Sequence, residues 1–584
     1  MKRRMTILLF LWLVPGMLAW SQETGLLDYR DAFEGAYRAF PDVPQGLLEA
    51  VSFTNTQCHH LTDANYFHDD ANAMPRSYGL MGLVKDGKGY FRENLHLVSD
   101  LSGFSEMEIL ESPTGNVMAY AKAFSRLTKE TDAHEIRGWL EVVAQLSELP
   151  VGEEKDVFPM QSMLYSVCLF LNDAEKAACY GFEQYHIDLP AIFAEYVEML
   201  AAPQLSMTRE TDYPLAIWDP APECNWEPRT KPVSAVVIHY TEGSYAGCIS
   251  WFKNCDSEVS AHYVIRSVDG QVTQMVREKD KAWHARTANG YTIGIEHEAY
   301  GNIWSFFTEA MYQSSADLVR DICSRNAVIS GHRTFYRDTL DNGVCLNNGL
   351  HDLGGEGACT KIRGHQHYPD QSHTDPGPYW DWNYYYKLIN EGTFVSVLEG
   401  NEGRLDHQNY GNDERRIWVI RTPESTKVQL TFSSFSMEAD YDFLWIYDGD
   451  NVYAPKIGRW NTHNPGVVQA SGNVMCVEFR SDCDINAAGW EASWSSISLV
   501  PVGPEIDKPD QGVFPNPTYG KFKVCSCNEG FTDMSVCDVF GKILLKARFI
   551  DTIEIDASSW APGVYVVNYG TPAVLGKVVK LVKL

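Results

Sequence analysis

The chain has 584 residues, a length that suggests roughly four domains at about 150 residues each. Its 77 acidic and 48 basic residues give a formal net charge of −29, which argues against a nucleic-acid binder because phosphate neutralisation needs a cationic face. With 45% hydrophobic and 21% charged residues, the composition is that of a globular protein and not of a disordered one.

The N-terminus predicts export. Basic residues at 2–4 precede a short apolar stretch at 5–12, and the small residues Ala19 and Ser21 suit a cleavage site, so we expect a signal peptide over 1–21. No later stretch is long and apolar enough for a transmembrane helix. Export permits disulfides among the 14 cysteines, although spacing does not settle their pairing, and the absence of CxxC pairs disfavours a zinc–cysteine site.

The pattern of the chain changes twice after the signal peptide. Residues 22–205 are predicted to be helical, since apolar residues recur at helical spacing, as at 47–51 and 140–146. Residues 206–393 alternate between strands and helices, which indicates an α/β domain. Its buried strands are expected at 233–239, 261–265 and 293–296, and an amphipathic helix at 309–325.

Period-two alternation predicts β structure in the rest of the chain. It occurs at 427–432 and 443–447, within a predicted all-β domain at 394–500. A proline-rich linker at 501–511 and a small β domain at 512–584 follow.

Polar residues of the α/β domain form a candidate zinc centre. His239 ends a buried strand, and His365 and Asp375 follow in distant segments. Two histidines and one carboxylate fill three corners of a zinc tetrahedron and leave the fourth for water, which suits hydrolysis better than a purely structural role. No HExxH helix occurs, so an ordinary zincin is not expected.

Several motifs in this region occur in a characteristic order. They are IHYTEG (238–243), SAHYVI (260–265), AWHA (282–285), YTIGIEHE (291–298) and GHQHYPDQSHTDPGPYWDW (364–382). The series resembles the zinc-dependent N-acetylmuramoyl-L-alanine amidases of type 2, which are related to peptidoglycan recognition proteins. The resemblance implies one zinc ion per chain and cleavage of the amide between N-acetylmuramic acid and the L-alanine of the stem peptide.

The resemblance also implies individual roles. The metal ligands fall on His239, His365 and Asp375, and the catalytic acid falls on Glu296, which would relay a proton from water to the leaving amine. His373 stands where relatives often carry a lysine that polarises the scissile carbonyl, and a histidine there would titrate near neutral pH.

Other residues of this domain are expected around the cleft. Tyr240, Trp283 and His284 are candidate substrate-binding residues, and a structural role for His284 is equally open. The insertion at 333–363 is expected to wall the cleft. Rival second ligands are His332, His367 and His373, and His365 is preferred because its spacing to Asp375 matches the family.

The N-terminal domain resembles a lysozyme-like or lytic transglycosylase domain over about residues 40–130. The resemblance rests on the motifs LLEAVSFTNT at 47–56 and YGLMGL at 78–83. The family's catalytic glutamate falls on Asn55, which cannot donate the proton that glycosidic cleavage requires. Glu49 lies about a turn and a half earlier on the helix and points elsewhere, so we expect an inactive domain that binds glycan.

Both C-terminal modules also resemble known families. The β domain at 394–500 resembles a CUB domain. The resemblance rests on DYDFLWIYDG (440–449), VEFRSD (477–482) and Gly489–Trp490, although Ala439 stands where the family often has a cysteine. The resemblance implies calcium carboxylates at Glu438, Asp442 and Asp482, and carboxylates suit calcium.

The last residues resemble the C-terminal sorting domain of the type IX secretion system of Bacteroidota. The resemblance rests on the motifs FPNPT (514–518), VFGK (539–542), DASSW (556–560), GVYV (563–566) and KVVKLVKL (577–584). The resemblance implies passage across the outer membrane and either release or surface attachment. The leading interpretation is therefore a secreted zinc amidase that acts on peptidoglycan or muropeptides, and the alternative is a non-catalytic peptidoglycan recognition protein.

Overall fold

The chain divides into two compact units, residues 1–497 and 498–584, and each is described by itself. In this computed structural model the first unit is described over 29–66, 72–131, 135–200, 211–301, 303–340 and 342–497. The second is described at 498, 512–514, 516, 518, 520–525, 532–538, 542–549, 552–570 and 577–583. The predicted signal peptide and linker lie outside the described residues.

The N-terminal region is helical, as predicted. Its helices are α2 (Arg30–Ala39), α3 (Leu47–Thr56), α4 (Asn94–Ser102), α5 (Glu106–Glu111), α6 (Pro113–Thr131), α7 (Ile136–Leu146), α8 (Val157–Asn172), α9 (Ala174–Tyr180), α10 (Leu189–Phe193) and α11 (Val197–Leu200), with a small hairpin of β1 (Ser77–Tyr78) and β2 (Leu83–Val84). Helix α8 is apolar on nearly every side, so it is buried at the centre of this region.

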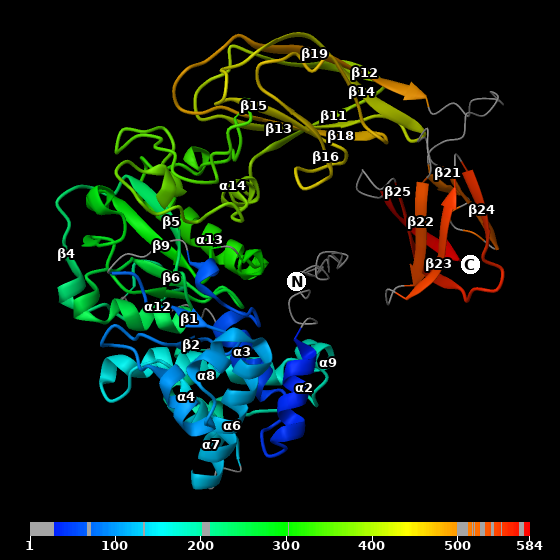
Figure 1. Cartoon of the computed structure of the whole chain (residues 1–584). Coiled ribbons are helices and arrows are strands. Elements are labelled where there is room, and N and C mark those ends of the chain that lie inside the picture. The colour runs from blue at the N-terminus through cyan, green and yellow to red at the C-terminus, as the bar shows by residue number, and fades with distance from the viewer. Residues whose placement is uncertain are drawn as a thin grey trace, which may run out of the picture. The chain divides into compact units, whose positions relative to one another are not determined.

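A mixed sheet organises the α/β domain, with strand order β10-β5-β9-β6-β7-β3. The strands are β3 (Ile217–Trp218), β5 (Ala235–Tyr240), β6 (Tyr263–Ile265), β7 (Val272–Gln274), β9 (Thr292–His297) and β10 (Ile362–Gly364). Beside them lie α12 (Tyr245–Phe252), α13 (Glu309–Arg325) and α14 (Trp382–Ile389), and β4 (Trp226–Pro228) pairs with β8 (Asp280–Ala282). Helix α13 spans the predicted range, and Figure 1 shows it beside the sheet.

The helical region and the α/β domain share one hydrophobic core. Leu48 and Val167 belong to the same buried cluster as Ile249 and Phe252 of α12. Polar contacts cross the same boundary: Arg266 Nη1 donates to Ser162 Oγ at 3.1 Å and Lys253 Nζ to the Lys155 carbonyl at 2.8 Å. Continuous apolar burial of this kind joins the two regions into one packed body.

A two-layer β-sandwich follows, as the alternating pattern predicts. One sheet has the order β11-β13-β18-β15-β16 and the other β12-β19-β14-β17, and Figure 1 shows both layers. The strands are β11 (Val395–Glu399), β12 (Glu402–Gln408), β13 (Arg415–Arg421), β14 (Thr426–Ser436), β15 (Phe443–Tyr447), β16 (Lys456–Trp460), β17 (Val467–Gln469), β18 (Val474–Arg480) and β19 (Gly489–Ser498). Residues such as Leu430, Ile446 and Trp490 fill the space between the sheets.

The second unit is a small β domain with its own core. Its sheets have the orders β20-β21-β24 and β23-β22-β25-β26. The strands are β20 (Gly512–Phe514), β21 (Lys521–Cys525), β22 (Thr532–Asp538), β23 (Ile543–Phe549), β24 (Thr552–Asp556), β25 (Gly563–Gly570) and β26 (Lys577–Lys583). Phe522, Val536 and Val567 are buried in this core.

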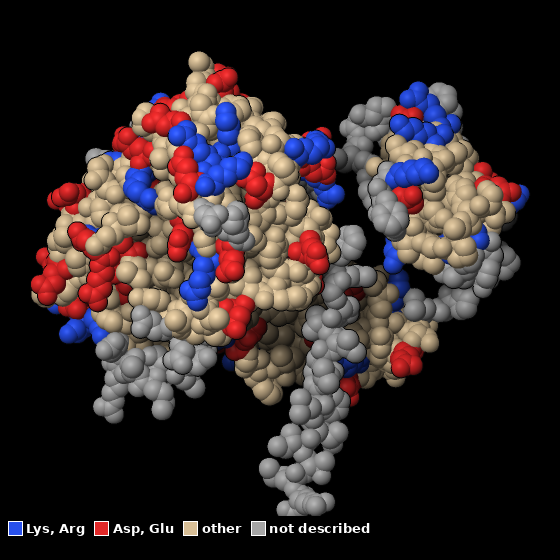
Figure 2. All heavy atoms as spheres, turned by 90° about the horizontal axis from the view of Figure 1, so that it is seen from below, with Lys and Arg blue, Asp and Glu red and all other residues tan. Residues whose placement is uncertain are grey.

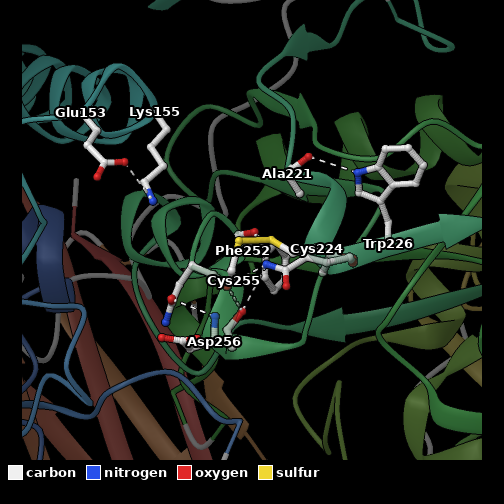
Figure 3. Close-up of a disulfide and its surroundings, with 12 residues drawn as sticks. Glu153, Lys155, Ala221, Cys224, Trp226, Phe252, Cys255 and Asp256 are labelled. Atoms are coloured by element: carbon white, nitrogen blue, oxygen red, sulfur yellow. Dashed lines mark hydrogen bonds and ion pairs between the residues drawn. A yellow bond between two sulfur atoms is a disulfide. The ribbon is translucent and has the colours of Figure 1, made fainter.

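Among the described residues, two disulfides join segments that are distant in sequence. Cys224 pairs with Cys255 near the start of the α/β domain, where Trp226 Nε1 also donates to the Ala221 carbonyl at 3.2 Å (Figure 3). Cys359 pairs with Cys483 of the sandwich. The cysteines that lie nearest to these in sequence, Cys248, Cys345 and Cys476, are free thiols, so proximity along the chain does not identify the pairs.

Charged side chains of both signs are interspersed on the surface. Figure 2 shows Lys and Arg next to Asp and Glu over the face in view, separated by large uncharged areas.

Candidate active site

The site begins at the carboxyl ends of two parallel strands. In the register of β5 and β9, His239 lies opposite Glu296. Residues paired in this way point to the same face of a sheet, so both side chains reach one cleft. His239 is 2% exposed, which the apolar run before it predicts.

Strand β10 brings the second segment alongside. Gly364 pairs with Ile238, which puts His365 beside His239. The chain then loops and returns at Asp375, whose carbonyl accepts from the Gln366 amide at 3.1 Å. His239, His365 and Asp375 are all buried, and one ligand atom from each lies within 4.8 Å of the others.

Both imidazoles face the same carboxylate. His239 Nδ1 lies 2.8 Å from Asp375 Oδ2, and His365 Nδ1 lies 3.0 Å from Asp375 Oδ1. Asp375 is 3% exposed. As a carboxylate it offers only acceptor atoms to the two rings.

The protonated nitrogen of His365 is identified by Gln371. Gln371 Nε2 donates to the carbonyls of Ala285 and Pro369 at 3.1 and 2.8 Å, so its Oε1 faces His365 Nε2 at 2.6 Å. A carbonyl oxygen only accepts, and His365 Nε2 must therefore carry the proton. In the neutral ring, Nδ1 then presents a lone pair to Asp375.

A second chain of hydrogen bonds identifies the protonated ring nitrogen of His239. Thr292 Oγ1 donates to the Ala288 carbonyl at 2.8 Å and so accepts from His284 Nε2 at 3.3 Å. His284 Nδ1 is then the acceptor for His239 Nε2 at 3.0 Å. Burial lowers the pKa of His239 to about 4, so this ring is neutral and its Nδ1 also presents a lone pair to Asp375.

Three acceptors thus converge on one point. Two imidazole lone pairs and a carboxylate repel one another unless a cation lies among them, and this donor set is one that zinc prefers. Each histidine is held through its other nitrogen, as is usual for metal-bound imidazoles. The residues present therefore fit a zinc ion.

Glu296 is a buried carboxyl group beside this cluster. Its pKa lies well above the ordinary value because of burial and then because of the charges of Asp375 and Glu242. Its Oε2 is buried without a hydrogen-bond partner among the described residues. A carboxyl group of this kind in a cleft is suited to exchanging protons with a reactant.

The cleft has a volume of about 490 Å³ and includes the predicted residues. Tyr240, Trp283, His284 and His373 line it, and the ring of His373 stacks on His365 with centroids 5.1 Å apart. Both ring nitrogens of His284 bond to protein atoms, Nδ1 to His239 and Nε2 to Thr292.

The expectation that the insertion at 333–363 walls the cleft is wrong. No described residue of that range lines it, whereas Asn72, Ala73 and Met74 of the helical region do. The insertion packs on the β-sandwich instead: Tyr336 lies in a buried cluster with Phe443 and Trp445.

Two of the three rival histidines lie away from the cluster, whereas the third, His373, stacks on His365 and lines the cleft. His332 Nδ1 contacts the Asp413 carbonyl of the sandwich. His367 is buried, with Nε2 2.9 Å from the Leu346 carbonyl and its ring stacked on Phe335. Sequence reasoning missed Gln371, Thr292 and Met74, because no motif spacing marks a residue that acts through another side chain.

Comparison with known proteins identifies the domain that holds this site. Residues 229–378 match the N-acetylmuramoyl-L-alanine amidase family. N-acetylmuramoyl-L-alanine amidase A from Achromobacter lyticus is 40% identical over 189 residues, which cover 31% of this chain and 97% of that protein. The chain belongs to the N-acetylmuramoyl-L-alanine amidase family.

Two further family matches cover the C-terminal modules of this amidase. Residues 396–494 match the CUB domain and residues 512–583 match the secretion system C-terminal sorting domain. Human tolloid-like protein 1 is 32% identical over 158 residues, which cover 25% of this chain but only 15% of that protein. A solved structure of PlyL is 15% identical and covers 31% of this chain and 98% of that chain, with a TM-score of 0.20.

The sorting domain marks the amidase for type IX secretion to the cell surface or the extracellular space. Among the described residues, no helix is long and apolar enough to cross a membrane. The protein is thus a secreted peptidoglycan amidase.

Proposed function

We propose that this amidase depends on one zinc ion held by His239, His365 and Asp375, and that it cleaves the amide between the lactyl group of N-acetylmuramic acid and L-alanine. The observation that carries the proposal is the convergence of three acceptors, with both histidine tautomers set by the surrounding hydrogen bonds. Zinc bound there supplies a Lewis acid that activates water and polarises the scissile carbonyl.

Glu296 is the proton-transfer group of the proposal. It lies in the same cleft, and burial raises its pKa, which makes the carboxylate a stronger base. It accepts a proton from the attacking water and delivers it to the amine that leaves. His373 lines the cleft, where it donates a hydrogen bond to the carbonyl oxygen as negative charge develops. Trp283 and Tyr240 contact the substrate as walls of the cleft.

Purified sacculi provide the test. The zinc-loaded protein should release stem peptides with a new L-alanine amine, detected by mass spectrometry, and a chelator should abolish release. Glu296→Ala should bind zinc as the wild type does and lose turnover by about 10²- to 10⁴-fold, whereas Glu141→Gln, an exposed change on α7, serves as the matched control.

Two outcomes would refute the proposal. If the zinc-loaded wild type released no stem peptides, the amidase reaction would be excluded for this wall. A fully active Glu296→Ala variant would exclude the assigned proton transfer.

We also propose that the helical region is a lysozyme-like domain without glycosidase activity. Asn55 Nδ2 donates to the Met81 carbonyl at 3.0 Å, and Tyr300 Oη of the amidase domain donates to the Asn55 carbonyl at 3.2 Å. Glu49 is buried and bonded to Tyr37. These contacts leave neither residue in the position of a general acid, so new reducing or anhydro sugar ends among the sacculus products would contradict this assignment.

We propose a calcium ion at Glu438, Asp442 and Asp482 of the CUB domain, whose ligand atoms lie within 4.8 Å of one another. Burial and then Asp482 raise the pKa of Glu438 to about 7, and burial raises the pKa of Asp442 to about 6. A hard cation would relieve the repulsion among these carboxylates.

Calcium should therefore raise the Tm of the wild-type protein, because a ligand that binds only the folded state stabilises it. Asp482→Asn should abolish the increase, and Asp450→Asn, an exposed change in the same domain, should preserve it. Equal calcium responses of Asp482→Asn and the wild type in differential scanning fluorimetry would exclude the site.

A further inference from the structure

Two segments that are distant in sequence meet at the amidase cleft. Arg286 lines the cleft from the segment after β8, and His373 lines it from the loop that precedes Asp375. Arg286 Nη1 donates to the Asp370 carbonyl at 3.2 Å, and its Nη2 donates to Ser372 Oγ at 2.6 Å. The guanidinium therefore connects the two segments and holds the residues directly before His373.

A third hydrogen bond lies between these two. Gln371 Nε2 donates to the Ala285 carbonyl at 3.1 Å. Three successive residues, 370–372, are thus bonded to the adjacent residues Ala285 and Arg286. We refer to these three hydrogen bonds as the Arg286 clamp.

The two sides of the Arg286 clamp are held in different ways. On one side, Asn289 Oδ1 accepts from the His284 and Ala285 amides at 3.0 and 2.5 Å, which fixes the backbone before Arg286. On the other side, the side chains of residues 370–373 are exposed or half-buried. Apolar packing therefore contributes little to the position of this loop, which depends on its polar contacts.

The backbone of Arg286 adopts the left-handed conformation, with φ of 50°. This conformation is unfavourable for a residue with a Cβ atom and is readily adopted by glycine. A strained non-glycine residue that lines a cleft points to a role for its side chain. The clamp supplies such a role, because the Arg286 side chain makes two of its three hydrogen bonds.

We propose that Arg286 is a positioning residue for the amidase reaction, which holds residues 370–372 so that His373 stays stacked on His365 in the cleft. The inference rests on the proposed function of His373 and deepens it. His373 acts as charge develops on the scissile carbonyl, so loss of its position should lower kcat and leave substrate binding in place. Gln371 bonds to main-chain carbonyls and not to the Arg286 side chain, so His365 keeps its orientation without the guanidinium.

The variant Arg286→Gly tests the proposal, because glycine removes the guanidinium and accepts the left-handed backbone without strain. We expect kcat on a soluble muropeptide to fall about 10- to 100-fold, while KM and the zinc Kd stay at the wild-type values. The Tm should not fall, since relief of the backbone strain offsets the loss of two exposed hydrogen bonds. Arg286→Lys, whose single ammonium reaches one of the two acceptors, should have an intermediate kcat.

A matched control comes from the CUB domain. Ser425 is an exposed residue that is also left-handed, with φ of 70°. Ser425→Gly relieves the same kind of strain away from the cleft, so its kcat should equal that of the wild type.

Hydrogen–deuterium exchange of the zinc-loaded, full-length protein gives a readout that does not depend on activity. The amides of residues 370–373 should exchange faster in Arg286→Gly than in the wild type, because their loop loses two of the three bonds of the clamp. Ser425→Gly should exchange at the wild-type rate there. Equal exchange in all three proteins would exclude the clamp.

The kinetic outcomes separate the positioning role from its alternatives. If the zinc-loaded wild type cut no muropeptide, the proposed function would fail, and the exchange rates would still test the clamp. If Arg286→Gly kept the wild-type kcat and raised only KM, Arg286 would bind substrate directly and would not position His373. A Tm that fell together with kcat would show a purely structural role and would overturn the proposal.

Discussion

At the scale of single residues, the tautomers of two histidines decide what the cluster can hold. Gln371 and the pair His284–Thr292 each accept a hydrogen bond from the outer nitrogen of one of these rings. Both inner nitrogens therefore face Asp375 as lone pairs. The ligands are visible in the sequence as HY, GH and DPG motifs, but the residues that orient them are not, because their role depends only on position in space.

Removing the acceptor of one ring should weaken metal binding. Gln371→Leu deprives His365 Nε2 of its partner, and we expect the zinc Kd to rise about 10- to 100-fold, measured by competition with a chelating dye. Gln408→Leu on the exposed edge of the CUB domain should leave the Kd unchanged. An unaltered zinc affinity in Gln371→Leu would show that this hydrogen bond does not orient the ligand.

At the scale of elements, a buried carboxyl group ties α2 to α3. Tyr37 Oη of α2 donates to Glu49 of α3, and the Leu48 amide donates back to Tyr37 at 3.1 Å. Burial raises the pKa of Glu49 from 4.5 to about 7. The amphipathic spacing of α3 predicts a buried face, but not that a glutamate lies on it.

The pKa of Glu49 makes the helical region sensitive to pH. Because the folded pKa exceeds the unfolded one, the stabilising contribution is complete below about 4.5 and is lost as pH rises through about 7. The loss is on the order of 3 kcal/mol.

Glu49→Gln should therefore match the wild-type Tm at pH 4.5 and exceed it at pH 8. Glu34→Gln, on the exposed face of α2, should follow the wild type at both values. Parallel Tm–pH curves for wild type and Glu49→Gln would contradict the assignment.

At the scale of the first unit, three regions form one packed body. The helical region shares a core with the amidase domain. The amidase domain meets the CUB domain through a second buried cluster, through the ion pair of Arg333 with Asp413 at 3.0 Å and through the disulfide between Cys359 and Cys483. The insertion at 333–363 therefore links the amidase domain to the CUB domain.

Breaking the disulfide between Cys359 and Cys483 should weaken the attachment of the insertion to the CUB domain without changing the amidase active site. The bond closes a loop of 124 residues, for which chain-entropy arguments give a stabilisation of about 4–5 kcal/mol. The variant Cys359→Ser/Cys483→Ser should be cut faster by protease within 333–363 while its amidase rate stays near the wild type. Cys345→Ser, which changes a free exposed thiol, is the control, and unchanged proteolysis of the double variant would contradict the role.

The sequence by itself determined the family, the order of the modules and the three residues that meet in the His239–His365–Asp375 cluster, because strand periodicity and motif order can be read along the chain. The position of α13 and the burial of Leu48 followed from the same patterns. The tertiary structure alone decided which cysteines pair, that the insertion faces the CUB domain, and that Met74 enters the cleft. These features depend on contacts between segments tens to hundreds of residues apart. Local sequence patterns do not indicate which of the distant apolar surfaces pack together and exclude water.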